Sequence, residues 1–207
     1  MGEISFNPWK TNGNFTNGFN VESDGLTQGD AQDDPAVRLQ LCTGHIDKKF
    51  TDSMWGGYGI LEQVPGITTT STGSIISAAT ATKINGFTVF NQAYHGLITA
   101  SSQVPQFTSP GTIHYYRFGS LARIPLPITA AVAALADEDN PTPVDASDFV
   151  WDITKFIIDI GSSGSKGPKV PIKLLKVVGA NNNLTVKKND DGTLVWDTTM
   201  PIGLFMM

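Results

Sequence analysis

The chain has 207 residues, a net charge of −5 and a pI near 5.0, so it has no general attraction for nucleic acid or anionic membranes. Hydrophobic residues make up 40% and charged residues 16%, against roughly 25% charged in a typical soluble domain, which excludes a disordered polyelectrolyte. The single cysteine, Cys42, excludes a disulfide-rich scaffold, and abundant Ser, Thr, Gly and Pro favour strands and turns over long helices.

Residues 1–35 are interpreted as an extended N-terminal arm, because they are rich in Asn and Gly and lack a sustained helical or strand period. Four aromatic side chains in this arm are costly to leave in water: Phe6, Trp9, Phe15 and Phe19. We therefore expect the arm to become ordered on a partner, with a frayed terminus as the alternative. Residues 36–207 are predicted to form one β-rich domain.

Short runs of alternating apolar and polar residues, separated by Gly and Pro, predict a series of strands. The predicted strands cover residues 37–41, 56–64, 83–84, 87–90, 112–118, 121–126, 148–153 and 170–174. Pro125 and Pro127 place their strand at a sheet edge, because proline cannot donate to a ladder. The alanine-rich residues 129–137 fit either a short helix or an apolar strand.

The clearest hairpin joins Leu184–Lys188 to Leu194–Trp196 through a turn at Asn189–Thr193. Residues 161–165, which are Gly and Ser, are predicted to be a flexible loop. Together these elements predict a mainly β fold, a β-sandwich or barrel-like antiparallel sheets, with little helix.

Charge is distributed in blocks along the chain. Residues 63–136 contain no Asp or Glu and only three basic residues, whereas residues 160–189 contain six lysines and no acid. Water-facing strands normally carry charges of both signs, so part of the acid-free stretch is expected to be covered. Burial in an oligomer or larger assembly is one explanation, and a surface coated with Thr, Ser and Gln is the other.

No catalytic or metal-binding motif is complete. His45, His95 and His114 lie on separate segments without a nucleophile signature, and the Gly161–Gly167 loop fails both the phosphate-loop and nucleophile-elbow patterns. Acidic pairs such as Asp190-Asp191 lack the spacing of a calcium loop. We expect no cofactor and no bound metal, and we interpret Cys42 as a small core residue.

The N-terminus lacks the basic start and apolar run of a signal peptide, and no stretch approaches the roughly 20 apolar residues of a membrane span. The sequence therefore predicts a soluble product made in the cytoplasm.

Several runs, taken in order, resemble the head structural proteins of tailed bacteriophages, in the cement or decoration class. The runs are Gly29–Pro35, Met54–Ile60, Gly86–Ala93, Tyr116–Ile124, Trp151–Thr154 and the segment from Lys173 through Trp196. The resemblance covers nearly the whole chain. It implies a non-enzymatic, mainly β virion protein on the outer capsid surface that bridges major capsid subunits as a trimer or other small oligomer.

The partners implied are thus the major capsid protein and other copies of this chain. The candidate contact residues are the four arm aromatics together with Trp55, Tyr58, Arg117 and Arg123. Two alternatives remain: a tail or baseplate protein with a receptor- or glycan-binding β-sandwich, and a small hydrolase that uses one of the three histidines.

Overall fold

The computed structural model describes residues 25–32, 35–67, 73–90, 104–139, 143, 148–161 and 167–207. Strands dominate these residues, and the two helices among them, α1 (Pro35–Arg38) and α3 (Ala130–Ala133), are one turn long. The prediction of a mainly β protein with barrel-like antiparallel sheets and little helix is confirmed. Residues 1–24 of the predicted arm lie outside the described residues.

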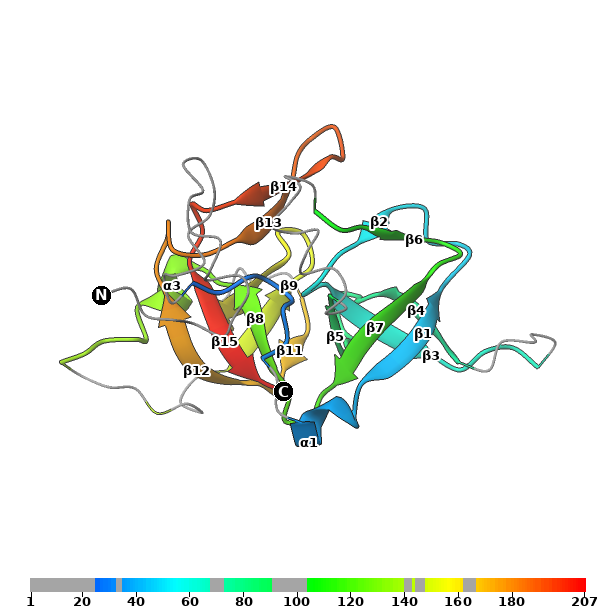
Figure 1. Ribbon diagram of the computed structural model, residues 1–207, viewed down its shortest axis with the longest axis horizontal. Coiled ribbons are helices and arrows are strands. Elements are labelled where there is room, and N and C mark those ends of the chain that lie inside the picture. Colours follow the sequence, from blue (N-terminus) through cyan, green and yellow to red (C-terminus); the bar gives the residue numbers. More distant parts are fainter. Residues whose placement is uncertain are drawn as a thin grey trace, which may run out of the picture.

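Five strands close into a barrel in the right-hand half of Figure 1. They are β1 (Cys42–Ile46), β3 (Gly59–Gln63), β4 (Ser74–Ala78), β5 (Gly86–Val89) and β7 (Thr112–Arg117). Their order around the barrel is β1-β4-β3-β5-β7, and every pair is antiparallel except β1 and β4. Alternate residues point inward, so isoleucines such as Ile46, Ile60 and Ile113 fill the interior.

Two three-stranded sheets occupy the other half of Figure 1. One places β9 (Phe149–Asp152) between β10 (Ile157–Ile160) and β11 (Lys169–Val170), and the other places β15 (Ile202–Met206) between β12 (Lys173–Val178) and β8 (Arg123–Pro127). A bridge between Ile128 and Ile158 connects them. Their apolar faces contribute to the larger core of the molecule.

Two short antiparallel pairs complete the fold: β2 (Ser53–Met54) with β6 (Phe107–Thr108), and β13 (Thr185–Lys188) with β14 (Leu194–Asp197), which is a hairpin. The predicted hairpin is therefore confirmed. Its turn is closed by two backbone hydrogen bonds, from the Asn189 N–H to the Thr193 carbonyl and from the Gly192 N–H to the Asn189 carbonyl (both 2.9 Å). Gly192 adopts a φ of 85°, which favours glycine.

The barrel packs on the second half through the outer faces of β5 and β7. The Phe87 and Trp151 rings meet edge to face, with centroids 5.1 Å apart. Gly59 allows this close approach, because a Cβ there would lie 2.4 Å from Trp151 Nε1. All four residues of β5 and all four of β9 are buried, so neither strand has a solvent-facing side.

The predicted sheet edge at β8 is confirmed, since β8 is an outer strand of its sheet. Its open side is covered by the segment before α1, because the Gly29 N–H donates to the Pro125 carbonyl (2.9 Å) and the Gln32 N–H to the Arg123 carbonyl (2.8 Å). The prolines remove donors from β8, but its carbonyls still accept these bonds.

Residues 25–32 belong to the folded body, so the predicted boundary between arm and domain at residue 35 is corrected. Gln28 has no exposed surface: its Nε2 donates to the Gly56 carbonyl (3.1 Å), and its Oε1 accepts from the Val186 N–H (2.8 Å). Gly29, with φ 71°, passes so close to Gly56 that a Cβ would clash with its backbone. These contacts join the barrel to the β13–β14 pair.

Two predicted strands are wrong, and the alternative left open for residues 129–137 resolves to a helix. Residues 83–84 form no strand and lie just before β5. Residues 37–41, predicted as a strand, form the end of α1 and a turn, and pairing with β7 begins only at Cys42. Pro35 occupies the first helical position, where proline is favoured. Residues 129–137 contain the helix α3, which begins where Thr129 Oγ1 accepts from the Val132 N–H (3.4 Å).

Candidate functional site

Trp55 and Tyr58, predicted to contact a partner, lie in the barrel core, with 0% and 5% of their surface exposed. Their rings pack edge to face with centroids 4.8 Å apart. Thr88 on β5 fixes this turn, because its hydroxyl donates to the Trp55 carbonyl and accepts from the Tyr58 N–H (2.8 Å). The prediction is corrected: these aromatics stabilise the fold. The arm candidates Phe6, Trp9, Phe15 and Phe19 lie outside the described residues.

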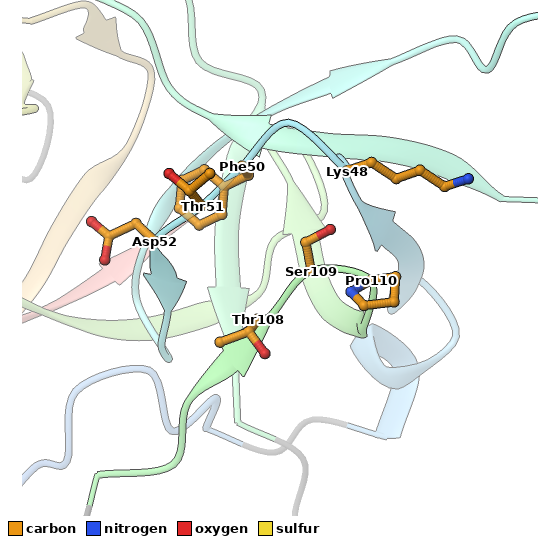
Figure 2. Close-up of a pocket in the computed structure, with 7 residues that line it drawn as sticks. All are labelled: Lys48, Phe50, Thr51, Asp52, Thr108, Ser109 and Pro110. Carbon is orange, nitrogen blue, oxygen red and sulfur yellow. The ribbon is translucent and has the colours of Figure 1, made fainter.

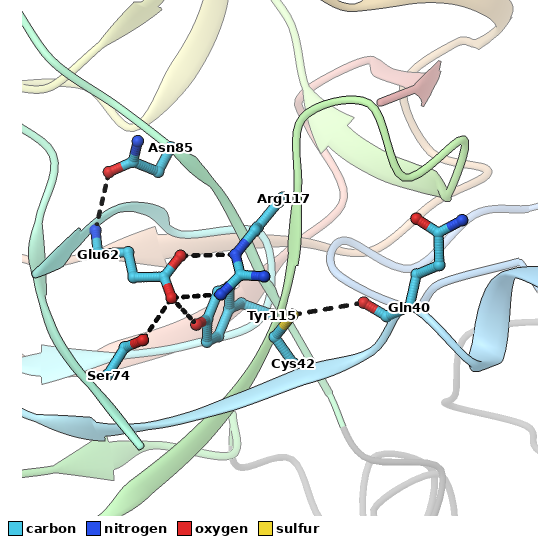
Figure 3. A network of polar contacts seen from close by, with 7 residues as sticks. All are labelled: Gln40, Cys42, Glu62, Ser74, Asn85, Tyr115 and Arg117. Carbon is cyan, nitrogen blue, oxygen red and sulfur yellow. Dashed lines mark hydrogen bonds and ion pairs between the residues drawn. The ribbon is translucent and has the colours of Figure 1, made fainter. Parts of the chain in front are cut away.

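Arg117, another predicted contact residue, belongs to a polar network at one end of the barrel (Figure 3). Its Nε donates to Glu62 Oε2 (2.7 Å) and its second guanidinium nitrogen to Glu62 Oε1 (2.5 Å), a two-bond pairing. The Tyr115 hydroxyl (2.8 Å) and Ser74 Oγ also donate to Oε1. The network therefore joins β3, β4 and β7.

The charges in this network stabilise one another. The hydrogen bonds from Arg117, aided by Ser74 and Tyr115, outweigh burial and lower the pKa of Glu62 to about 2. Burial, together with the hydrogen bond to Glu62, raises the pKa of Tyr115 to about 12. The Glu62 carboxylate also raises the pKa of Arg117. Glu62 is thus ionised and saturated with donors, which suits a structural role better than proton transfer.

This network holds the base of the β3–β4 connection, of which residues 64–67 and 73 are described. Glu62 is near the end of β3 and Ser74 is the first residue of β4, so their hydrogen bond closes the loop at its root. A second bond across the base joins Gln63 Nε2 to Ser77 Oγ (3.1 Å). The loop therefore leaves the barrel from a fixed base.

Beyond that base, the loop exposes two large apolar side chains. Val64 is 92% exposed and Ile67 is fully exposed. The sequence reasoning missed these two residues, although Val64-Pro65-Gly66-Ile67 places apolar side chains around a turn signal, where polar residues are usual. We call Val64 and Ile67 the apolar loop pair.

The acid-free stretch of residues 63–136 divides into two parts. It supplies β5, β7 and β8, of which β5 is wholly buried and β8 is buried from Ile124 onward. For β5 and most of β8 the chain's own core accounts for the absence of acid, and burial of the rest of the stretch in an assembly stays a prediction. The apolar loop pair belongs to the same stretch and is left uncovered by the described residues.

Arg123 is exposed at the start of β8, and its carbonyl accepts the bond from Gln32. Cys42 is half-buried at the start of β1 and packs against the barrel core, as its interpretation as a core residue predicts. Arg117 and Arg123 are not linked by any bond, and they pair with different strands, β5 and β15.

The described histidines, His45 and His114, lie on the neighbouring strands β1 and β7. His114 Nδ1 is 2.8 Å from Thr43 Oγ1 in an exposed hydrogen bond, but no described carboxylate is bonded to the ring to orient it as a base. His95 lies outside the described residues. In the described part of the chain, no three His, Cys, Asp or Glu residues form a group that could hold a metal.

A shallow, open hollow of about 540 Å³ lies between the β1–β2 connection and the β6–β7 turn (Figure 2). Its lining residues are Lys48, Phe50, Thr51, Asp52, Thr108, Ser109 and Pro110. Burial alone would raise the pKa of Asp52. The ion pair with Lys188 and the hydrogen bond from the Ser53 N–H (2.8 Å) outweigh burial, so the pKa of Asp52 lies below its ordinary value. The hollow thus offers a single, already paired carboxylate, whereas glycosidase chemistry needs two.

Neither helix in the described part of the chain has the length and apolar character that crossing a bilayer requires. Comparison with protein-family models, with curated proteins and with solved structures found no match.

Proposed function

We propose that this chain is a non-enzymatic structural protein of a tailed-phage virion, which binds the outer surface of the capsid and stabilises contacts between major capsid subunits. The observation that carries the proposal is the apolar loop pair on its rigid base. The order of sequence runs that resembles the cement or decoration class supports it. A protein that binds only the assembled shell stabilises that shell by mass action, and many sites on a lattice add through avidity.

The apolar loop pair suits a contact that stays formed. Burying a Val or Ile side chain contributes roughly 1.5–3 kcal/mol, and nothing in the described part of the chain covers either one. The hydrogen bond between Ser74 and Glu62 holds the strand ends beside Val64 in place, which lowers the entropic cost of forming a contact there. The loop is also free of acid, as the cores of protein contacts tend to be.

The proposal includes self-association, with a trimer as the favoured oligomer. Sedimentation of the purified protein at micromolar concentration should then give a mass above the 22.1 kDa of one chain. A clean monomer under these conditions would count against self-association but not against capsid binding.

The central test is attachment to heads. Purified protein is mixed with phage heads that lack it, and the bound fraction is measured by co-sedimentation. Near-stoichiometric binding over the whole head surface is expected. Labelled protein that gathers at the tail instead would favour the receptor- or glycan-binding alternative, for which the hollow beside Phe50 and Asp52 would be the place to look.

The loop is tested by the double variant Val64→Asp/Ile67→Asp. Loss of two buried apolar contacts should weaken attachment at least about tenfold, since each 1.4 kcal/mol is a factor of ten. Leu39→Asp is the matched control, because Leu39 is also an apolar side chain that is 90% exposed, but it follows α1 and does not belong to the loop. Equal weakening by the control, or full attachment of the double variant, would show that the loop is not the contact.

The arm and the histidines give two further comparisons. Phe6→Ala/Trp9→Ala should weaken attachment if the arm aromatics reach a neighbouring subunit. His45→Ala/His95→Ala/His114→Ala should attach normally, and the loss of a hydrolytic activity in this variant would favour the hydrolase alternative.

A further inference from the structure

The turn between β9 and β10 is built around one buried carboxylate. Asp152, the last residue of β9, is 3% exposed. Its Oδ1 accepts hydrogen bonds from the Thr154 N–H (2.8 Å), the Thr154 hydroxyl (2.6 Å) and the Lys155 N–H (3.0 Å). The Phe156 N–H donates to the Asp152 carbonyl (2.8 Å). A single residue therefore fixes the path of the chain from β9 to Phe156.

These hydrogen bonds hold a strained backbone in place. Phe156 has a φ of 57°, in the left-handed region, where a bulky side chain is unfavourable. Such a conformation persists only where its surroundings impose it. The Asp152 carboxylate does so here, because hydrogen bonds to an ionised group are stronger than those to a neutral one.

The strained backbone places the Phe156 ring between the two cores of the molecule. The ring centroid is 5.1 Å from that of Trp55 and 5.3 Å from that of Tyr58, which belong to the barrel core. It is 6.4 Å from that of Trp151, in the larger core. Among the described residues, Phe156 is the one partly buried apolar side chain that packs against both cores. The ring thus closes the interface between the barrel and the second half at Trp55.

Trp55 makes this closed arrangement less favourable than a fully paired core. Its Nε1–H is buried and has no acceptor among the described residues. A buried donor without a partner loses the hydrogen bond that water would give it. Withdrawal of Phe156 would admit water to the Trp55 ring, so an opened turn would recover this bond and relieve the backbone strain together.

The charge of Asp152 opposes this opening. Burial alone would raise the pKa of Asp152, but the hydrogen bonds from Thr154 and Lys155 outweigh burial, so the pKa lies below its ordinary value of 3.8. The stabilisation by these bonds is therefore complete above pH 3.8 and is lost as the pH falls below that value.

Few other ionisable groups surround this carboxylate among the described residues. Lys155, in the same turn, is the charged group that acts on Asp152. Asp159 on β10 and Lys169 on β11 lie on the same face of the sheet, one residue pair farther from the turn. On the barrel side, burial raises the pKa of Tyr58, so its hydroxyl is neutral at acid and neutral pH.

We propose that the β9–β10 turn is an acid-sensitive clasp: the ionised Asp152 holds Phe156 between the two cores, and protonation of Asp152 releases the ring and opens the interface at Trp55. Protonation weakens three hydrogen bonds at once, whereas the strain at Phe156 and the unpaired N–H of Trp55 remain. The contact between Phe87 and Trp151 is not held by the turn, so the opening is local. This inference does not depend on the proposed function.

The test is hydrogen exchange of indole and amide N–H groups, followed by NMR on the full chain. Asp152→Asn keeps the shape of the side chain and an acceptor oxygen but removes the charge. At pH 7 it should speed exchange of the Trp55 Nε1–H and of the Thr154 and Lys155 amides about tenfold or more. The Trp196 Nε1–H, also buried and without a described acceptor but located on β14, is the internal reference and should change little. Unchanged exchange of the Trp55 Nε1–H would overturn the proposal.

Two further variants separate the parts of the clasp. Asp148→Asn is the matched control, because this carboxylate directly precedes β9 but is exposed and pairs with Lys169 (2.6 Å), and it should leave Trp55 exchange unchanged. Phe156→Gly removes the ring and suits the positive φ, so the turn amides should keep their protection while the Trp55 Nε1–H exchanges faster. Trp55 exchange that Phe156→Gly leaves unchanged would contradict a ring that closes the interface.

Acid titration of the unchanged protein keeps the test decisive if Asp152→Asn folds poorly. The exchange rate of the Trp55 Nε1–H, divided by that of the Trp196 Nε1–H, should rise as the pH falls below 3.8. The ratio cancels the intrinsic effect of pH on indole exchange. Glu62 titrates in the same range, so Glu62→Gln is the control and should show the same rise. A ratio that is constant from pH 5 to pH 2, or a rise that Glu62→Gln abolishes, would overturn the proposal.

Discussion

Gln28 and Glu62 each join segments that are distant in the chain, but they do so in different surroundings. Gln28 is a neutral amide without exposed surface, whose partners are backbone groups of Gly56 and Val186. Glu62 is a charged group at the barrel end, and the side chain of its partner Arg117 is 55% exposed. A buried ion would pay a large desolvation cost, so a neutral group serves inside and charges serve where water reaches.

The largest expected loss of stability comes from replacing the buried Gln28. Gln28→Ala leaves the Gly56 carbonyl unpaired in the interior, removes the partner of the part-buried Val186 N–H, and opens a cavity where the amide stood. We expect the free energy of unfolding, measured with urea, to fall by about 2–4 kcal/mol. The exposed Gln63→Ala is the control and should change it by less than about 0.5 kcal/mol. A loss below about 1 kcal/mol for Gln28→Ala would show that its bonds are easily replaced.

Glu62, at the end of the barrel, should contribute less than Gln28 to stability and more to attachment to phage heads. Glu62→Gln preserves the shape but removes the charge from three donors, so the unfolding free energy should fall by about 1–2 kcal/mol. Because Glu62 holds the base of the apolar loop pair, its loss should also weaken co-sedimentation with heads. Gln28→Ala, assayed below its unfolding transition, should not.

Glu138→Gln, an exposed acid after α3, is the control for both measurements. If Glu62→Gln and the unchanged protein attach equally well, the Glu62 network does not affect attachment through the apolar loop pair and contributes to stability only.

Local patterns in the sequence predicted the elements whose determinants are close together in the chain. The β13–β14 hairpin follows from its turn. The strands β3, β5 and β7 follow from short runs of alternating apolar and polar residues that are bounded by Gly and Pro. The edge position of β8 could be derived from Pro125 and Pro127 alone, because a missing donor constrains a ladder wherever it occurs.

The predictions that were wrong depended on partners distant in sequence. Trp55 and Tyr58 turn inward because Thr88, about thirty residues later, binds their turn. In β5 the absence of acid reflects burial between the barrel interior and Trp151, which the local pattern does not reveal. Gln28 gives no sequence signal at all, since its partner Val186 is 158 positions away.

Lowering the pH should distinguish the contribution of Glu62 to stability from that of Gln28. The folded pKa of Glu62, about 2, lies below its ordinary value of 4.5, so its contribution is complete above pH 4.5 and is lost as the pH falls toward 2. The difference in unfolding free energy between the unchanged protein and Glu62→Gln should therefore shrink over that range. The cost of Gln28→Ala should not change, because an amide does not titrate. A constant Glu62→Gln difference from pH 7 to pH 2 would contradict the assigned ion pair.

Arg117→Lys should have the smallest effect and tests the geometry of the pair. Lysine keeps the positive charge but replaces the planar fork, which donates to both oxygens of Glu62, with a single ammonium group. We expect a loss of about 0.5–1 kcal/mol, measured as a shift of the urea midpoint at an unchanged slope. Arg123→Lys is matched in chemistry and exposure but has no such partner among the described residues, so it should shift the midpoint less. If both substitutions shift it equally, the two-bond geometry contributes nothing beyond charge, and the barrel end is held by Ser74 and Tyr115 instead.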